Sequence, residues 1–212
     1  MLRHDRLRVI AGPLMVLILG MSAPSSVPEK EALPNFHQVN QNLYRGAQPR
    51  EGGIQKLKEL GVKTVINLRG ADEGTEAEER DVRAAKLNYF NVPMDGLGRP
   101  SDEKVEKILA LINNAKNWPV FIHCNHGKDR TGTIIACYRI SHDGWTLDEA
   151  MKEAKRYGMS WVQFKMKDYI KDYARKRGQV SQTSEHEREQ REGNLFLHSA
   201  KAFSFFTNFA TS

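Results

Sequence analysis

The chain has 212 residues, of which 40% are apolar, so it can bury the core of one ordinary domain with extensions at its ends. Its formal net charge of +6 favours anionic partners. Nucleic acid is disfavoured, because the sequence has no zinc-finger spacing and no basic run with interleaved aromatic residues. The two cysteines, Cys124 and Cys137, are too few for a disulfide framework or a zinc site.

The N-terminus has the pattern of an export signal. Three arginines among the first eight residues precede an apolar stretch from Val9 to Met21, which is short for a helix that crosses a bilayer. We predict a signal peptide over residues 1–23, with an uncleaved membrane anchor as the alternative. The body is then expected in the periplasm or secreted, with membrane contact through this segment alone. A Pro- and Ser-rich linker is expected over residues 24–34.

Between residues 35 and 178, short apolar runs alternate with amphipathic stretches. Runs rich in β-branched and aromatic residues predict strands, and apolar residues at helical spacing predict helices. Strands are expected within 42–49, 62–68, 87–94 and 119–124, and helices within 52–61, after the acidic segment 71–81, within 101–112, after Gly127 and from Thr146. This alternation predicts an α/β fold with a central, mostly parallel sheet flanked by helices.

The last predicted helix runs from about Ser160 to Gly178. Four apolar residues at helical spacing are expected on its buried side: Val162, Met166, Ile170 and Tyr173. Residues 179–212 differ in character, because a polar stretch is followed by a Phe-rich end. We predict a disordered tail there, and its role stays open.

The segment HCNHGKDRTG, residues 123–132, joins the predicted strand ending at Cys124 to the helix expected after Gly127. Such a loop collects unpaired backbone N–H groups and the positive end of the helix dipole, so it suits an anion. Arg130 can contact two oxygens of a tetrahedral phosphate held there. The same groups favour the thiolate of Cys124, which can attack phosphorus in line and form a phosphocysteine. Thr131 is placed to donate its hydroxyl to the sulfur and help it leave.

With these residues in place, the chain resembles the cysteine-dependent protein tyrosine and dual-specificity phosphatase superfamily. HCNHGKDRTG is the signature, and NLYRGAQP, VINLRG and NVPMDGLGRPSDEKV resemble the compact bacterial members and their atypical plant and fungal relatives. The resemblance covers roughly residues 33–178. It implies a dual-specificity phosphatase-like three-layer fold, a cysteinyl-phosphate intermediate, and no metal or other cofactor. It also implies a P-loop whose phosphate-binding residues are Asn125, His126, Gly127, Lys128, Asp129 and Arg130.

The leaving group of such a reaction needs a proton from a general acid. In the resembling family this acid is an aspartate on a separate mobile loop, and here Asp95 in PMDGLGRPSDE is the best match. Asp129 inside the cradle and Asp102 in the first turn of a helix are the alternatives. The W-P-D motif of tyrosine-specific enzymes is absent, so the choice stays open.

Basic residues at the cradle bear on the substrate. Lys128 resembles a position found in phosphatases that act on phosphoinositides or inositol phosphates, and extra cations suit a substrate with several phosphates. Phosphotyrosine or other phosphorylated proteins are the alternative substrates. His123 is interpreted as an orienting hydrogen-bond partner, and Arg45 and Arg69 mainly as structural supports. Cys137 is interpreted as a small buried hydrophobe.

Two other classes of protein compete with a phosphatase. A rhodanese-type sulfurtransferase also carries a cysteine in a cradle, but its loop before the arginine is one residue shorter. A non-catalytic phosphate-binding module is the other alternative, and it would have no use for a thiolate. The sequence therefore predicts a cysteine-dependent phosphoric monoester hydrolase acting on phosphorylated proteins or on inositol phosphates and phosphoinositides.

Overall fold

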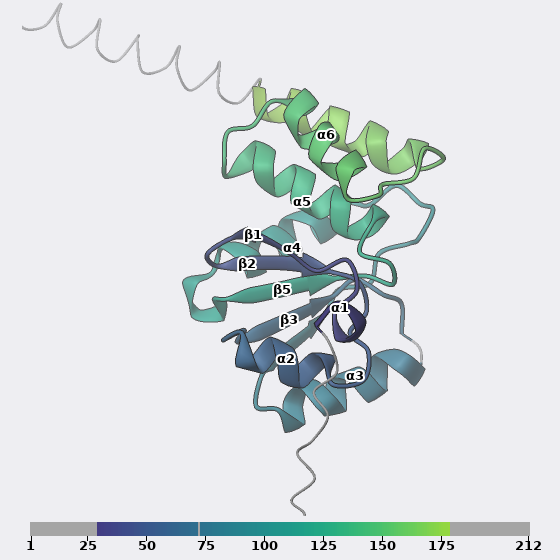
Figure 1. Cartoon of the computed structure of the whole chain (residues 1–212). Coiled ribbons are helices and arrows are strands. Elements are labelled where there is room, and N and C mark those ends of the chain that lie inside the picture. The colour runs from purple at the N-terminus through teal and green to yellow at the C-terminus, as the bar shows by residue number, and fades with distance from the viewer. Residues whose placement is uncertain (1–28, 72, 179–212) are drawn as a thin grey trace, which may run out of the picture.

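A five-stranded sheet forms the centre of the structure, a computed structural model that describes residues 29–71 and 73–178 (Figure 1). The strands are β1 (His37–Asn40), β2 (Leu43–Gly46), β3 (Thr64–Asn67), β4 (Asn88–Asn91) and β5 (Val120–His123). Their order is β1-β2-β5-β3-β4, and all neighbours are parallel except the pair β1 and β2. The predicted fold class is therefore confirmed. The antiparallel edge strand β1 was not predicted, because three of its residues are only partly buried, Gln38 is exposed, and the segment lacks a clear apolar alternation.

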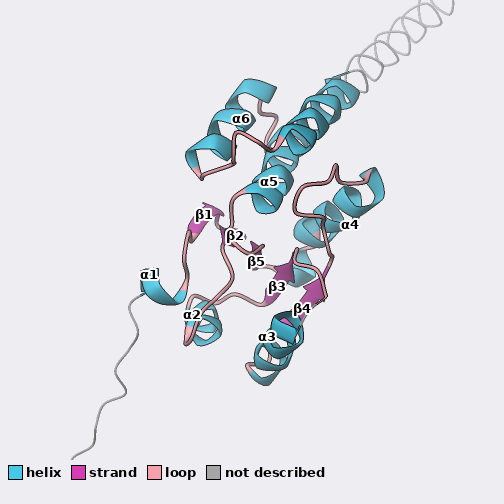
Figure 2. Ribbon diagram, turned by 90° about the vertical axis from the view of Figure 1, so that its right-hand side faces the viewer, coloured by secondary structure: helices cyan, strands magenta, loops and turns pink. Residues whose placement is uncertain are grey.

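Helices cover both faces of this sheet (Figure 2). They are α1 (Glu29–Ala32), α2 (Gly53–Glu59), α3 (Glu73–Ala84), α4 (Asp102–Asn113), the short 3-10 helix η1 (Ala115–Asn117), α5 (Asp129–Ser141), α6 (Leu147–Arg156) and a last helix over residues 164–178. In Figure 1, α2 and α3 lie below the sheet, and α5, α6 and the last helix lie above it. The result is the predicted arrangement of three layers.

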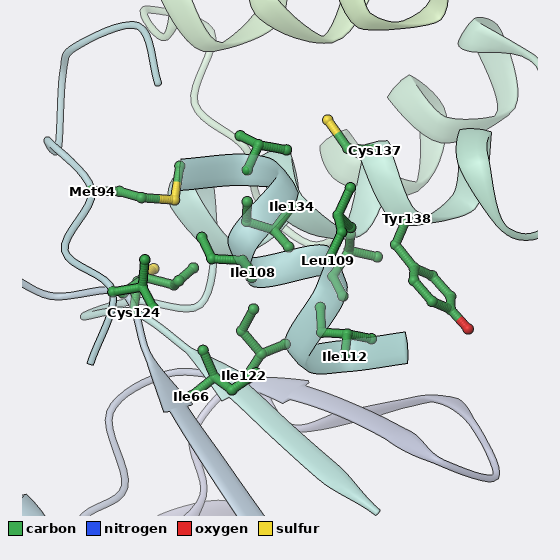
Figure 3. Close-up of a cluster of buried hydrophobic side chains, with 14 of the residues drawn as sticks. Ile66, Met94, Ile108, Leu109, Ile112, Ile122, Cys124, Ile134, Cys137 and Tyr138 are labelled. Carbon is green, nitrogen blue, oxygen red and sulfur yellow. The ribbon is translucent and has the colours of Figure 1, made fainter. Parts of the chain in front are cut away.

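Each face of the sheet has its own apolar core. Ile122 of β5 packs with α4 and α5 in the larger core, which Figure 3 shows in close-up. Phe121, the preceding residue, points to the other face and packs with Leu57 of α2 and Val82 of α3. Successive side chains of a strand point to opposite faces, so β5 is buried on both sides. The strand that leads into the HCNHGKDRTG loop is thus held rigidly in the middle of the molecule.

The structure corrects the start of the last predicted helix. Residues 161–163 form a turn, and the helix begins at residue 164 rather than near Ser160. Met166, Ile170 and Tyr173 are buried as predicted, but Val162 is 44% exposed. Periodicity failed at Val162 because this residue precedes the helix and does not follow its spacing.

The ends of the domain also differ from the predicted outline. Helix α1 lies within the segment predicted as a linker, and Leu33 just after it is only 1% exposed. The predicted signal segment and the predicted tail lie outside the described residues. Within residues 29–71 and 73–178, no helix combines the length and the apolar character needed to traverse a bilayer.

Candidate active site

The HCNHGKDRTG loop lies at the carboxyl end of the central strand. β5 ends at His123, one residue earlier than predicted, and α5 begins at Asp129. The neighbours of β5 on both sides, β2 and β3, run parallel to it, so the loops that follow all three strands meet at this edge of the sheet. Open α/β sheets bind their ligands at such an edge. The residues from Cys124 to Lys128 therefore occupy the expected position of a cradle.

Gly127 gives this loop its tight turn. Its φ of +66° lies in the left-handed region, and a Cβ atom there would come within 2.4 Å of the backbone carbonyl of Gly46 on β2. Both conditions favour glycine. The side-chain amide of Asn35 donates hydrogen bonds of 3.1 Å to the carbonyl oxygens of His126 and Gly127. The loop is thus held from the side of β2 and β1.

Arg45 of β2 supports the loop from inside the molecule. It is fully buried, and its Nη2 donates a 2.8 Å hydrogen bond to the carbonyl oxygen of Gly127. The guanidinium carbon lies 4.6 Å from the ring centroid of Tyr157, while Nε and Nη1 have no hydrogen-bond partner among the described residues. Burial lowers the pKa of Arg45 to about 10, and the neighbouring charges of Glu153 and Cys124 oppose that shift. A positive charge therefore lies directly beneath the cradle.

The two cysteines lie in different surroundings. Cys124 is 3% exposed and contacts the larger apolar core near Met94, whereas Cys137 lies further along α5 (Figure 3). Burial raises the pKa of the Cys137 thiol, so this residue stays protonated and behaves as the predicted small hydrophobe. Thr131 in the first turn of α5 is fully buried, and its hydroxyl has no hydrogen-bond partner among the described residues. The expected hydrogen bond to the cysteine sulfur is therefore not formed.

Arg130 reaches toward the ends of the neighbouring strands. Its Nη1 donates to the carbonyl oxygens of Leu68, after β3, and Met94, after β4, at 3.2 and 3.4 Å. The side chain is partly buried, and these contacts leave the other guanidinium nitrogens for an anion. Arg130 thus links the cradle to the loop that carries Asp95.

Asp95 is exposed and directly follows a residue that Arg130 contacts. Its Oδ1 accepts hydrogen bonds from the backbone N–H groups of Leu97 (2.8 Å) and Gly98 (3.0 Å). These two bonds, helped by the charges of Lys165 and Arg130, lower the pKa of Asp95. In this conformation the carboxylate of Asp95 is held by backbone N–H groups of its own loop. It must leave these hydrogen bonds before it can donate a proton to a substrate.

The two alternative acids are engaged elsewhere. Asp129 accepts a 2.7 Å hydrogen bond from the backbone N–H of Ser160, which ties the start of α5 to the turn after α6. Asp102 forms a 2.6 Å ion pair with Lys176 of the last helix, and this partner lowers the pKa of its carboxyl. Both residues have a clear structural role. Of the two candidates outside the cradle, only Asp95 lies in a loop whose backbone contacts Arg130.

His123 belongs to a buried polar network on the α3 side of the sheet. Its Nε2 lies 2.8 Å from Oε1 of Glu78, without the alignment of a full hydrogen bond, and both side chains are almost completely buried. The other carboxylate oxygen of Glu78 accepts from Asn67, which also donates to the hydroxyl of Tyr89. Burial raises the pKa of Tyr89 to about 12, so it stays a neutral partner. This network fixes the residue that directly precedes Cys124.

A depression of about 460 Å³ lies beside the cradle. Its polar and basic lining residues are Asn35, Gln48, Arg50, Asn125, His126 and Lys128. Arg69 donates a 2.6 Å hydrogen bond to the side chain of Gln48, whose backbone N–H donates to Asn125. Arg69 thus acts as the structural support that the sequence favoured. The phosphate-binding candidates His126 and Lys128 both line this space.

Sequence reasoning missed several residues that shape the site. Asn35 and Tyr157 lie far from the signature in sequence and have no motif of their own. Glu78 had a usable signal, since it lies four residues before the buried Val82 and so shares its helical face. An acid on a buried face is unusual enough to indicate a specific partner.

Residues 28–172 match the family described as "DSP-PTPase phosphatase fused to NAD+ Kinase". The chain belongs to this family. Among its relatives, the "Probable tyrosine-protein phosphatase DG1060" of Dictyostelium discoideum is 31% identical over 140 residues, 64% of this chain and 83% of that protein. The "Dual specificity protein phosphatase TpbA" of Pseudomonas aeruginosa strain UCBPP-PA14 is 31% identical over 154 residues, 71% of this chain and 67% of that one.

A solved structure agrees with this result. The core catalytic domain of the PP-IP phosphatase SIW14 from S. cerevisiae, crystallised with citrate, matches with a TM-score of 0.60 at 25% identity. The match covers 69% of this chain and 93% of the SIW14 domain. The family resemblance, the dual-specificity phosphatase-like fold and the phosphatase activity inferred from the sequence are therefore confirmed. This DSP-PTPase family member is a cysteine-dependent phosphatase.

Proposed function

We propose that Cys124 is the nucleophile and that Arg130 binds the phosphate in the cradle formed by Asn125 to Arg130. The observation that supports this most strongly is the position of Cys124, at the end of the central strand and just before the N-terminus of α5. The cysteine thiolate attacks phosphorus, and the bond from phosphorus to the leaving oxygen breaks. Water then attacks the phosphocysteine, phosphate departs and the thiolate is restored. The hydroxyl of Thr131, which has no partner among the described residues, turns toward the departing sulfur in this step and donates to it.

Asp95 is proposed as the general acid. It donates its proton to the leaving oxygen in the first step and takes a proton from the attacking water in the second. The contact between its loop and Arg130 supports this assignment. The lowered pKa of Asp95 belongs to a conformation in which Leu97 and Gly98 hold its carboxylate. Substrate binding at Arg130 is expected to draw the loop toward the cradle.

The substrate is proposed to be a polyphosphorylated inositol, free or as a lipid head group. The depression beside the cradle supports this choice, because Arg50, His126 and Lys128 line it and can pair with further phosphates. The name of the relative SIW14, a PP-IP phosphatase, agrees with it. Phosphotyrosine is the second candidate, favoured by the names of DG1060 and TpbA. The exported location predicted from the N-terminal residues is retained as part of the proposal.

The first test is phosphate release by the full chain and by Cys124→Ser, without added metal. We expect release from an aryl phosphate by the parent and none by the variant. Release that survives in the serine variant would remove Cys124 from the mechanism. Tight phosphate binding without turnover in the parent would favour the binding module, and cyanide-dependent transfer of sulfur from thiosulfate would favour the sulfurtransferase.

The second test concerns the substrate. We expect Arg50→Gln and Lys128→Gln to raise KM for inositol hexakisphosphate and leave KM for a simple aryl phosphate nearly unchanged. Lys63→Gln is the matched control, because Lys63 is exposed and lies just before β3, at the opposite end of the sheet from the cradle. Equal effects on both substrates would contradict a second phosphate subsite. Preference for a phosphotyrosine peptide in the parent would favour the second candidate.

A further inference from the structure

The exposed large apolar side chains of the described chain gather in two short segments. They are Leu97 (70% exposed), Trp161 (77%), Val162 (44%) and Phe164 (62%). Scattered single residues of this kind are normal on a protein surface, but a gathered set marks an interaction site. We call these four residues the apolar rim.

A hydrogen bond joins the two segments, and a ring contact lies within the second of them. The buried Gln163 donates a 2.9 Å hydrogen bond from its side-chain amide to the carbonyl oxygen of Gly96, the residue before Leu97. The rings of Trp161 and Phe164 meet edge to face with centroids 6.5 Å apart. The apolar rim is therefore one surface formed by two parts of the chain.

The charges beside Trp161 and Phe164 are mainly positive, and the exposed Asp95, whose Oδ1 accepts from Leu97, is the anionic neighbour of the apolar rim. Residues 155–167 contain four cationic residues, Lys155, Arg156, Lys165 and Lys167, and no Asp or Glu. Lys167 donates a 2.9 Å hydrogen bond to the carbonyl oxygen of Trp161, and its amine lies 6.0 Å from the ring centroid of Phe164. Lys167 thus lies against the aromatic segment, and Lys165 is its near neighbour in sequence.

The apolar rim adjoins the mouth of the active site. Ser160, next to Trp161, donates its backbone N–H to Asp129 at the start of α5. The side chain of Lys128 lies against Gly158, where an added Cβ would be 3.1–3.2 Å from it. Leu97 belongs to the same loop as Asp95. Whatever covers the apolar rim therefore lies next to the cradle.

We propose that the apolar rim docks on an anionic phospholipid bilayer. Exposed Trp and Phe side chains surrounded by Lys and Arg are the composition of segments that lie in the membrane interface, where the rings enter the head-group region. The lysines are attracted by the negative surface potential of such a membrane. Protein interfaces, by contrast, are depleted of Lys at their core. The contacts of Lys167 with the Trp161 backbone and the Phe164 ring favour the bilayer over a protein partner.

Docking in this way brings the cradle next to the lipid head groups. The sequence predicted membrane contact through the N-terminal segment alone, and the apolar rim adds a second contact that belongs to the folded domain. The docking proposal does not depend on the substrate proposed above, since hydrolysis of a soluble aryl phosphate needs no membrane. The two proposals can therefore fail separately.

The test uses the fluorescence of Trp161 in the full chain. The sequence has three tryptophans, so Trp118→Phe with Trp145→Phe leaves Trp161 as the only reporter. The matched control is Trp118→Phe with Trp161→Phe, which leaves Trp145, whose ring packs 4.4 Å from the guanidinium carbon of Arg139. Both chains are mixed with vesicles of phosphatidylcholine and phosphatidylglycerol that carry bromine on their acyl chains. Hydrolysis of the aryl phosphate confirms that each variant is folded.

We expect the emission of Trp161 to shift to the blue and lose intensity with bromolipid, and the emission of Trp145 to stay unchanged. Because the reporter is local, binding through the N-terminal segment does not produce this signal. An unchanged Trp161 in a chain that sediments with the vesicles would overturn the proposal, and so would a chain that does not bind them. Quenching of both reporters to the same extent would also contradict it, since it would indicate a general insertion of the chain.

Two further variants separate apolar from electrostatic attraction. Trp161→Ala with Phe164→Ala is expected to reduce binding to the vesicles, measured by sedimentation, by about tenfold or more, because two exposed rings that would enter the head-group region are lost. Lys165→Gln with Lys167→Gln is expected to weaken binding only when phosphatidylglycerol is present. Lys58→Gln with Lys63→Gln has the same charge change at exposed positions away from the apolar rim and serves as control. Equal losses in both lysine pairs would contradict a specific docking surface.

Discussion

The Nη2 of Arg45 donates a 2.8 Å hydrogen bond to the carbonyl oxygen of Gly127, so a buried side chain of β2 holds the turn of the cradle. This support is costly to the fold. The pKa of Arg45 is lowered to about 10 by burial, and a decrease of this size from 12.5 corresponds to about 3 kcal/mol against the charged form. A buried charge with two unpaired nitrogens adds little to stability and can lower it. The charges of Arg45 and Cys124 attract each other, so we predict that Arg45 also contributes to the reaction.

We therefore expect Arg45→Met to lower activity without lowering stability. Removal of the buried charge gains about 3 kcal/mol, whereas loss of the bond to Gly127 costs about 1–2 kcal/mol and loss of the contact with the Tyr157 ring about 1 kcal/mol, so the free energy of unfolding stays about the same or rises slightly. The value of kcat/KM for an aryl phosphate falls by about tenfold or more, because the turn loosens and the thiolate loses a nearby cation. Urea unfolding and steady-state kinetics measure the two effects.

Arg139→Met is the control for this substitution. Arg139 forms ion pairs with Asp143 (2.6 Å) and Glu153 (2.8 Å), all with little exposed side-chain area. Its removal leaves these carboxylates without their partner, so the free energy of unfolding is expected to fall by about 3 kcal/mol. If Arg45→Met instead loses stability and keeps its activity, Arg45 is a purely structural residue.

The second prediction concerns Asp95 and the leaving group. Asp95→Asn is expected to lower kcat/KM by about 100-fold or more on an alkyl phosphate, whose leaving group needs a proton. On an activated aryl phosphate the loss is expected to be small. Equal losses on both substrates would remove Asp95 from the role of acid. Asp102→Asn is the control, since its carboxyl is paired with Lys176 and should affect both substrates little.

The expected pH dependence of kcat/KM follows from the lowered pKa of Asp95. A general acid must be protonated, and the backbone N–H groups of Leu97 and Gly98 lower the pKa of Asp95 below the usual value of about 3.9. Since kcat/KM reports the free enzyme, its value for an alkyl phosphate falls as pH rises above that lowered pKa. The ratio of kcat/KM for the parent to kcat/KM for Asp95→Asn is independent of the titration of the substrate, because both enzymes act on the same substrate. This ratio should decline steadily from the acid side toward neutral pH.

Local patterns were enough to predict the sheet and the position of the cradle. The runs around Val65 and Phe121 are apolar because these strands are buried on both faces, which gives a strong signal. Helix caps were also visible, because Ser101 accepts from the backbone N–H of Lys104 as its position before an apolar stripe indicates. The signature placed Cys124 between strand and helix on the same local grounds.

Long-range partners could not be predicted in this way. Arg45 and Gly127 are 82 positions apart, and no local sequence pattern in either segment indicates that the two residues are in contact. The same holds for Gln163 and Gly96, whose hydrogen bond joins the two parts of the apolar rim. Val162 was misplaced because helical spacing was extended one turn beyond the start of the helix. Pairings of this kind depend on the packed fold and not on the neighbours in sequence.

The third prediction concerns Gly127. An alanine there must adopt a left-handed φ and place its Cβ 2.4 Å from the carbonyl carbon of Gly46. We expect Gly127→Ala to lower the free energy of unfolding by about 3 kcal/mol or more and to abolish activity. Gly61→Ala is the matched control, because its φ of +79° is also left-handed but nothing lies within 4 Å of its Cβ. Gly61→Ala should lower the free energy of unfolding by only about 1–2 kcal/mol and leave the activity unchanged. Equal costs at both sites would show that close approach to β2 is unimportant.

The fourth prediction separates the two cysteines by their reactivity. The thiolate is the form that reacts with iodoacetate, and the anion-binding cradle attracts this anionic reagent to Cys124. Cys137 is fully buried, and burial raises the pKa of its thiol, so it stays protonated and unreactive in the folded chain. Mass spectrometry should therefore find one carboxymethyl group per folded chain, located on Cys124, and added inorganic phosphate should slow its formation by competing for the cradle. Cys124→Ser should take up none until urea exposes Cys137. Modification of Cys137 at the same rate as Cys124 in the folded protein would contradict the burial on which this assignment rests.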